Sequence, residues 1–160
     1  MSDQLSSSAL RVQAFLSEHG KGFRVQELPD STRTAKDAAN AIGCTVSQIA
    51  KSLVFKDKKT GEAVLVVASG TNRVCATKVE EATGIVLMKA DAEYVREKVG
   101  YAIGGVPPVA HRESVRTLLD PALKKYPTIW AAAGTPNAVF ELKAADLETL
   151  TNGQWVDIAE

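Results

Sequence analysis

The chain has 160 residues, 45% of them hydrophobic, and its 19 Lys and Arg residues balance its 19 Asp and Glu residues. This length and composition suit one globular domain over residues 1–160. Zero formal charge excludes the strongly basic surface of proteins that coat duplex DNA or an anionic membrane, so we expect neither partner and only a small, local contact with any RNA.

Helix and strand signals alternate from the N-terminus. Serines at 6–8 offer N-caps for a helix with one apolar face, which Gly20 is expected to close. Residues 23–28 alternate between apolar and polar side chains as a strand does, and 29–31 predict a turn.

Two capping patterns follow in the next stretch. Thr34 with Asp37 predicts the start of a helix that Gly43 ends, and residues 45–48 cap a second short helix. We expect this second helix to deliver Lys51, which then stands where the helix meets a strand.

A β-hairpin is the strongest pattern in the sequence. Residues 52–56 and 63–69 are rich in strand formers, and the intervening "DKKTG" suits a tight turn. Further helices are expected at 78–83, 91–98 and 144–150, and extended segments at 85–88, 101–103, 115–119, 128–132, 139–142 and 155–158. Because long crossover helices do not regularly separate the strands, the fold class is α/β (α+β): one mixed, mostly antiparallel curved sheet surrounded by short helices.

Targeting, metal and redox signals are weak. The N-terminus lacks a signal-peptide pattern and no run of about 18 apolar residues occurs, so we expect a soluble, cytoplasmic protein. Cys44 and Cys75 fit no metal-ligand spacing and read as structural thiols, so we expect no metal and no cofactor. No Gly-x-Ser-x-Gly elbow or serine triad is present.

Lys51 is the first candidate site residue, because it stands beside the apolar run Leu53-Val54-Phe55. Burying its charge would lower its pKa, while at a pocket rim it could donate to a carbonyl or phosphate oxygen. The alternative is a lysine at a helix C-terminus that complements the helix dipole and reaches solvent.

The loop "GGVPPVAH" at 104–111 is the second candidate. Gly104 and Gly105 let backbone N–H groups approach a ligand, and two prolines stiffen the loop that presents them. A plain tight turn is the alternative. His111 could orient a water or contact substrate, or be a surface histidine.

Two polar turns each follow an apolar strand, where binding groups are often kept. They are "SGTNR" at 69–73, with Ser69 and Gly70, and "AGTPN" at 133–137, with Ala133 and Gly134. Solvated turns are the alternative for both.

Four segments in order resemble the YbaK/EbsC family: "VSQIAKSLVF" at 46–55, "VASG" at 67–70, "GYAIGGVPP" at 100–108 and "GTPNAVFEL" at 134–142. The family includes the editing (INS) domain of bacterial prolyl-tRNA synthetases and its free-standing relatives. The resemblance, over about 12–150, implies a mixed α/β domain that hydrolyses the ester between a wrong amino acid and tRNA, typically tRNA(Pro).

The resemblance also implies roles for residues. Lys51 falls on the family lysine and would hold the substrate at the pocket wall, while N–H groups of Gly104, Gly105 and Val106 grip the ester carbonyl or the amino acid. Water would be the nucleophile, with help from a ribose hydroxyl; lysine as a base would need a pKa several units lower. Further expected substrate contacts are Ser52, Ser69, Gly70, Pro108, His111, Ala133, Gly134 and Leu28.

The sequence departs from the cysteinyl-tRNA(Pro) deacylase branch of that family. Where the branch has a Ser-Gly-Gly segment and a later Asp, this chain has 132–134 (AAG) and Val139, and a tyrosine is replaced near Leu28. A more apolar pocket favours alanine or 2-aminobutyrate, then Ser or Thr, although one methylene is worth only roughly 1–3 kcal/mol in such a pocket.

The acceptor end of tRNA is the expected partner, and prolyl-tRNA synthetase is a further possible one. Expected tRNA contacts are Arg24, Arg33, Lys36 and Arg73. The alternatives are a Cys-tRNA(Pro) deacylase, a catalytically silent module that binds tRNA or a synthetase, and a small-molecule hydrolase.

Overall fold

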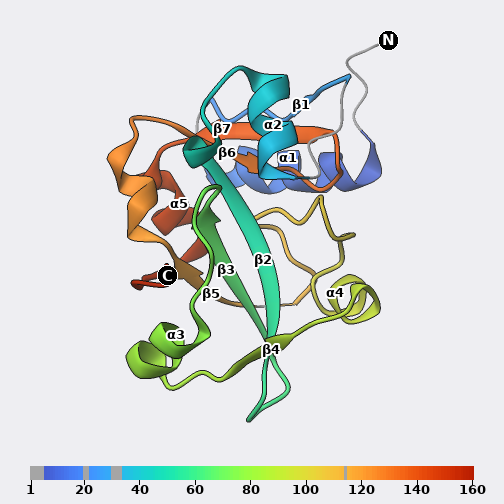
Figure 1. The fold of residues 1–160 in the computed structure, drawn as a ribbon. Coiled ribbons are helices and arrows are strands. Elements are labelled where there is room, and N and C mark those ends of the chain that lie inside the picture. Colours follow the sequence, from blue (N-terminus) through green and yellow to red (C-terminus); the bar gives the residue numbers. More distant parts are fainter. Residues whose placement is uncertain (1–5, 20–21, 30–33, 114) are drawn as a thin grey trace.

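The computed structural model describes residues 6–19, 22–29, 34–113 and 115–160. Within this part of the chain, eight strands form one sheet in the order β1-β7-β6-β2-β3-β5-β8, and β4 pairs with β2 beside this path (Figure 1). The strands are β1 Gln26–Glu27, β2 Ile49–Asp57, β3 Ala63–Ser69, β4 Leu87–Lys89, β5 Arg116–Leu119, β6 Ile129–Ala132, β7 Ala138–Leu142 and β8 Gln154–Trp155.

The centre of the sheet is the predicted hairpin of β2 and β3. Its antiparallel register runs from Ala50 opposite Ser69 to Lys56 opposite Ala63. The pairs β1–β7, β2–β4 and β6–β7 are also antiparallel, whereas β2–β6, β3–β5 and β5–β8 are parallel. The mixed, mostly antiparallel sheet predicted from the sequence is therefore confirmed.

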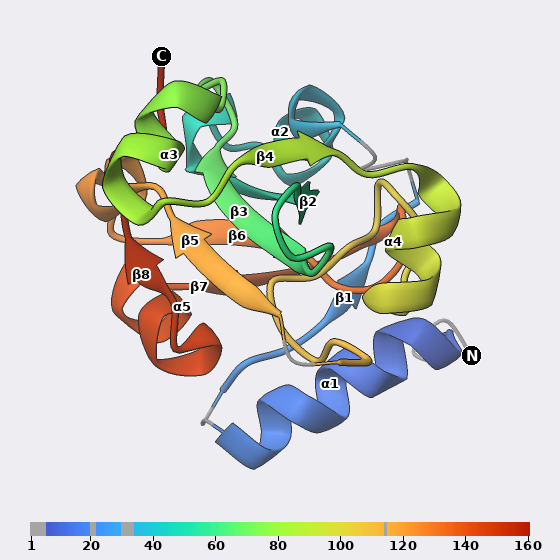
Figure 2. The same ribbon diagram turned by 90° about the horizontal axis from the view of Figure 1, so that it is seen from below.

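Helices cover both faces of this sheet. They are α1 Ser7–His19, α2 Ala35–Ile42, α3 Ala76–Thr83, α4 Ala92–Lys98 and α5 Ala144–Thr151, with 3₁₀ turns η1 Val46–Gln48 and η2 Pro121–Lys125. Figure 2 shows α1 and α3 on opposite sides of the sheet.

Strand β3 explains why both faces need cover. Leu65 and Val67 pack in the cluster that includes α1 and α5, whereas Val64 and Val66 pack in the cluster that includes Val79 of α3. Because successive strand side chains point to opposite faces, a continuous apolar run such as that of β3 is buried on both sides.

Local capping signals predicted the starts of α2 and α4 correctly. The Thr34 hydroxyl accepts a hydrogen bond from the Asp37 N–H at 3.0 Å, and α2 ends at Gly43, which has a φ of 89°. Asp91 likewise accepts from the Tyr94 N–H at 2.8 Å at the start of α4. These side chains satisfy N–H groups that the first helical turn leaves free.

Four sequence expectations need correction. Residues 101–103 form no strand: the chain bends at Tyr101 and enters a turn at Ile103, while the buried Tyr101 hydroxyl donates to the Ala110 carbonyl. The strand expected at 23–28 forms only over Gln26–Glu27, as β1, and the one expected at 155–158 forms only at Trp155, in β8. Lys51 is the third residue of β2, which starts at Ile49, so it does not lie at a helix C-terminus. Gly20 and most of the turn at 29–31 lie outside the described residues.

Candidate active site

A cavity of about 370 Å³ opens between α2, β2, β6 and the loop after residue 102. Its walls are mainly apolar, with Ala35 and Ala38 from α2 and Trp130 from β6 among them. Lys51 and Ser52 of β2 bring polar groups to it. An apolar hollow with few polar groups is the usual form of a small-ligand site.

The cavity exists because β2 lacks a neighbour along part of one edge. β6 pairs with β2 only at Ile49 and Ala50, and β4 pairs with it only from Phe55 onward. Between these two pairings, residues 51–54 have β3 on their other side and no strand of the described chain on this one. Backbone groups on such an edge are available to a ligand.

Lys51 lies half-buried in the cavity wall, and its Nζ donates to the Gly70 carbonyl at 3.3 Å. Burial lowers the pKa of the Lys51 ammonium, and the positive charge of Arg73 lowers it further, while the Asp120 carboxylate acts in the opposite direction. Nearby groups therefore compensate the positive charge of the amine only in part. An amine in that state can donate to an anionic or carbonyl oxygen of a ligand.

The turn that receives the Lys51 ammonium is held tightly. A Cβ on Gly70 would lie 2.2 Å from the Val46 carbonyl oxygen, so only glycine fits there. Next to it, the Ser69 hydroxyl donates to the Ser47 carbonyl at 2.7 Å. Ser69 and Gly70 thus position Lys51 and do not line the cavity themselves.

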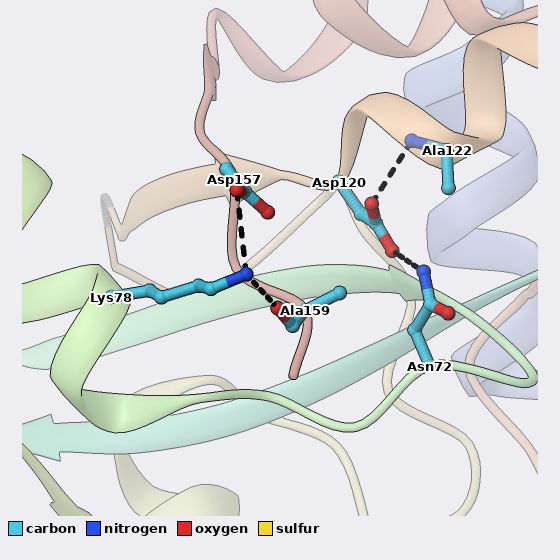
Figure 3. A network of polar contacts seen from close by, with 6 residues as sticks. All are labelled: Asn72, Lys78, Asp120, Ala122, Asp157 and Ala159. Atoms are coloured by element: carbon cyan, nitrogen blue, oxygen red, sulfur yellow. Dashed lines mark hydrogen bonds and ion pairs between the residues drawn. The ribbon is translucent and has the colours of Figure 1, made fainter.

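Behind this turn lies Asp120, a buried carboxylate that the sequence analysis did not single out (Figure 3). It accepts hydrogen bonds from the Ser69 N–H at 3.0 Å and the Asn72 side-chain amide at 2.8 Å, and its other oxygen accepts from the Ala122 N–H at 3.0 Å. The only local signal is an Asp-Pro pair after a strand, which predicts a cap for a short helix.

The glycine loop is only partly at the cavity. Gly104, with a φ of 95°, and Val106 line it. Gly105 does not: its N–H donates to the Ala102 carbonyl at 3.0 Å, and a Cβ there would lie 2.7 Å from the Thr135 backbone. The expectation that the Gly105 N–H grips an ester carbonyl therefore needs correction, because that donor is already used.

Pro108 and His111 line a different, more open hollow beside α1. The His111 ring nitrogen Nε2 lies 2.7 Å from the Pro107 carbonyl oxygen. Burial lowers the pKa of His111, and this hydrogen bond partly opposes the change. The structure does not bring these two residues to the Lys51 cavity.

The second polar turn supports the site from behind. Ala133 is fully buried, and the Gly134 N–H donates to the Gly105 carbonyl at 2.9 Å, which ties the two loops together. Ala132 and Val139, the positions that depart from the cysteine branch, do line the cavity. Leu28 pairs through its backbone with Asn137 and is not part of the cavity wall.

The basic residues proposed for tRNA contact are exposed where the structure describes them. Lys36 follows the wall residue Ala35 on α2, and Arg73 is close enough to Lys51 to affect its pKa. Arg24 lies just before β1, and Arg33 lies outside the described residues. Trp130 is a wall residue that the sequence analysis missed, since a tryptophan in a strand usually indicates core packing.

The described residues hold no group of three or more His, Cys, Asp or Glu side chains arranged for a metal ion. Nor is any helix among them long and apolar enough to cross a bilayer.

Comparison with known protein families identifies the family of this chain. The family described as "Aminoacyl-tRNA editing domain" matches residues 29–150, which include every wall residue of the cavity. The chain belongs to this aminoacyl-tRNA editing family. It is therefore an editing domain, an enzyme that acts on the ester bond of aminoacyl-tRNA.

Several individual proteins are similar to this editing domain in sequence or structure. A crystal structure described as a candidate trans-editing enzyme for prolyl-tRNA synthetase superposes with a TM-score of 0.91 at 49% identity, covering 98% of this chain and 99% of that one. The uncharacterized protein YwhH of Bacillus subtilis is 31% identical over 93% of this chain and 95% of its own. EbsC of Enterococcus faecalis, named as a candidate Cys-tRNA(Pro)/Cys-tRNA(Cys) deacylase, is 28% identical over 78% of this chain and 76% of its own.

Proposed function

We propose that the whole chain, 1–160, is a trans-editing deacylase that removes alanine or 2-aminobutyrate, and less readily Ser or Thr, from mischarged tRNA(Pro) in the cytoplasm. The observation that carries this proposal is one amine, Lys51, set in the wall of a mainly apolar cavity of about 370 Å³. Support for tRNA(Pro) comes from the names of the prolyl-tRNA synthetase trans-editing relative and of EbsC.

The proposed reaction is hydrolysis with water as the nucleophile. Water adds to the ester carbonyl, the bond to the terminal ribose oxygen breaks, and that oxygen takes a proton as the free amino acid leaves. The Lys51 ammonium and the N–H groups of Gly104 and Val106 donate to the oxygen that becomes negative. Donors fixed in advance stabilise such a charge more than mobile water does.

The size and polarity of the cavity wall favour a small aliphatic side chain. Ala132 and Val139 offer no hydroxyl or carboxylate to a thiol or alcohol, whereas Trp130 and Ala38 offer apolar surface. A cysteine substrate is the second candidate, favoured by the name of EbsC. One extra or missing small group changes discrimination by only about 10- to 200-fold, so both candidates belong in one assay.

The test is a panel of tRNA(Pro) charged with alanine, 2-aminobutyrate, serine, threonine, cysteine or proline, assayed for release of the amino acid. Alanine or 2-aminobutyrate should be released fastest, and Lys51→Ala should lower the rate at least 100-fold, since one transition-state donor is worth about that much. Lys56→Ala on the same strand is the matched control, because Lys56 lies over the Tyr94 ring and outside the cavity.

Each outcome distinguishes between the candidates. Fastest release of cysteine would favour the second candidate. No release from any charged tRNA, with tight tRNA binding, would indicate a silent binding module. An unchanged rate for Lys51→Ala would contradict the mechanism.

A further inference from the structure

A second hollow, of about 200 Å³, adjoins the Lys51 cavity along the same strand. The two share a wall formed by Ser52, Leu53, Ile103, Gly104 and Val106. Beyond this shared wall, the smaller hollow is lined by Val54 and Phe55 of β2, by Ala90 and by Val95 of α4. Figure 1 shows β2 running from beside α2 toward β4, with α4 to one side.

The smaller hollow is mainly apolar, with Phe55 in its wall, but it also has a polar group, the hydroxyl of Ser52. The Ser52 hydroxyl oxygen is buried and has no hydrogen-bond partner within the described part of the chain. Buried hydroxyls are nearly always paired, so an unpaired one at a hollow indicates a partner that arrives with a ligand. A purely apolar ligand would leave it unsatisfied.

The strand edge adds further donors and acceptors. Residues 51–54 of β2 have no strand neighbour of the described chain on the side of the two hollows. A free strand edge presents alternating N–H and C=O groups. Adenine carries the complementary pattern, an acceptor nitrogen next to an amino donor, on a flat ring whose faces suit apolar walls.

Covalent connectivity orders the substrate along β2. In aminoacyl-tRNA the amino acid, the ribose and the terminal base follow one another directly. If the ester lies at Lys51 and Gly104, the ribose falls at the shared wall, where Ile103 is 54% exposed, and the base must lie just beyond it. The smaller hollow is the enclosed space next in line.

We propose that the smaller hollow binds the adenine of the 3′-terminal adenosine of the tRNA, with the Ser52 hydroxyl and the free edge of β2 contacting the nucleoside. This inference rests on the proposed function for the placement of the ester. It makes editing depend on the terminal nucleoside as well as on the amino acid.

The test compares two non-hydrolysable probes by calorimetric titration of the full chain. The first is 3′-alanylamino-3′-deoxyadenosine, and the second is the same compound without its base. The adenosine probe should bind about tenfold tighter or more, since stacking of one base is typically worth at least that much. Ala90→Phe, which fills only the smaller hollow, should abolish this difference.

Ala35→Phe is the matched control, because Ala35 lines only the larger cavity. It should weaken both probes to a similar extent and keep the preference for the base. Ser52→Ala removes one oxygen without overpacking, so it remains informative if Ala90→Phe fails to fold; it should weaken the adenosine probe about fivefold.

Equal affinities of the two probes, including no measurable binding of either, would overturn the inference, as would an intact base preference in Ala90→Phe. Turnover of mischarged tRNA is measured separately. Turnover with equal probe affinities leaves the proposed function standing and this inference wrong, whereas a base preference without turnover gives the reverse.

Discussion

At the scale of single residues, the site depends on a short relay of hydrogen bonds that ends at one amine. Asp120 holds the turn at Ser69 and Asn72, and the Gly70 carbonyl of that turn accepts from Lys51 Nζ at 3.3 Å. Lys51 could be singled out as a candidate from its neighbours in sequence, whereas the groups that position it come from two other segments, the turn after β3 and Asp120 before η2.

The pH dependence of editing should report the state of Lys51. Its pKa is lowered by burial and by Arg73, so its ammonium loses a proton at a lower pH than an exposed lysine does. If the charged form is the active one, activity relative to spontaneous hydrolysis falls as the pH rises through this lowered pKa. Lys51→Arg should extend the plateau to higher pH, because guanidinium does not titrate there. Identical pH profiles of the two proteins would contradict a charged donor at this position.

Asp120 should matter for stability far more than an exposed acid in the same region. Asp120→Ala leaves three donors without their acceptor, at the Ser69 N–H, the Asn72 amide and the Ala122 N–H, and should lower the free energy of unfolding by about 3 kcal/mol. Urea unfolding measures this difference.

The control for Asp120 is Asp157, which pairs with Lys78 at 3.5 Å while its side chain is 76% exposed (Figure 3). Asp157→Ala should change the free energy of unfolding by less than about 1 kcal/mol, as exposed ion pairs usually do. Equal losses for the two variants would show that Asp120 does not hold the turn as described.

At the scale of elements, the cavity is shaped by how far each neighbour of β2 extends. β6 and β4 each pair with only one end of β2, and α2 contributes its small side chains Ala35 and Ala38 to the wall of the cavity beside the unpaired stretch. Small residues on α2 leave room for a ligand where larger ones would fill the space.

The start of α2 should therefore affect both stability and activity. Thr34→Ala removes the hydroxyl that accepts from the Asp37 N–H and should cost about 1 kcal/mol in unfolding free energy, whereas Thr34→Ser should be nearly neutral. Because Thr34 and Ala35 also line the cavity, kcat/KM for the mischarged tRNA should fall in the alanine variant and recover in the serine variant. A Thr34→Ala protein that is less stable but keeps the kcat/KM of the original protein would argue against this coupling.

At the scale of the whole molecule, the hollow lined by Pro108 and His111 lies between α1 and the loop after Val106. His111 lies there among Arg11, Glu18, Arg112 and Glu113. This arrangement indicates a structural contact between α1 and the loop after Val106, which are far apart in sequence.

The buried His111 at this contact should make the folding stability of the protein decrease in mild acid. Burial lowers the pKa of His111 below its ordinary value of about 6.5, so between the two values the unfolded chain binds more protons than the folded one. Stability is therefore full above about pH 6.5 and decreases as the pH falls through the folded-state pKa. His111→Gln, which keeps a donor for the Pro107 carbonyl, should flatten the dependence of urea unfolding on pH between about 7 and 5; an unchanged slope would contradict this account.

The local chain determined most of the elements and indicated Lys51 as a candidate site residue. The hairpin of β2 and β3, the caps at Thr34 and Asp91, and Lys51 beside an apolar run could all be predicted, because capping and side-chain alternation act over only a few residues.

Tertiary contacts decided the rest. Three features follow from the pairing of segments far apart in the chain. The Gly105 N–H is already hydrogen-bonded, Asp120 lies behind the Gly70 turn, and His111 faces a separate hollow. No local sequence pattern encodes these long-range contacts. Backbone donors pair with whichever acceptors the packed sheet brings close to them, and only the assembled sheet leaves one edge of β2 open to a substrate.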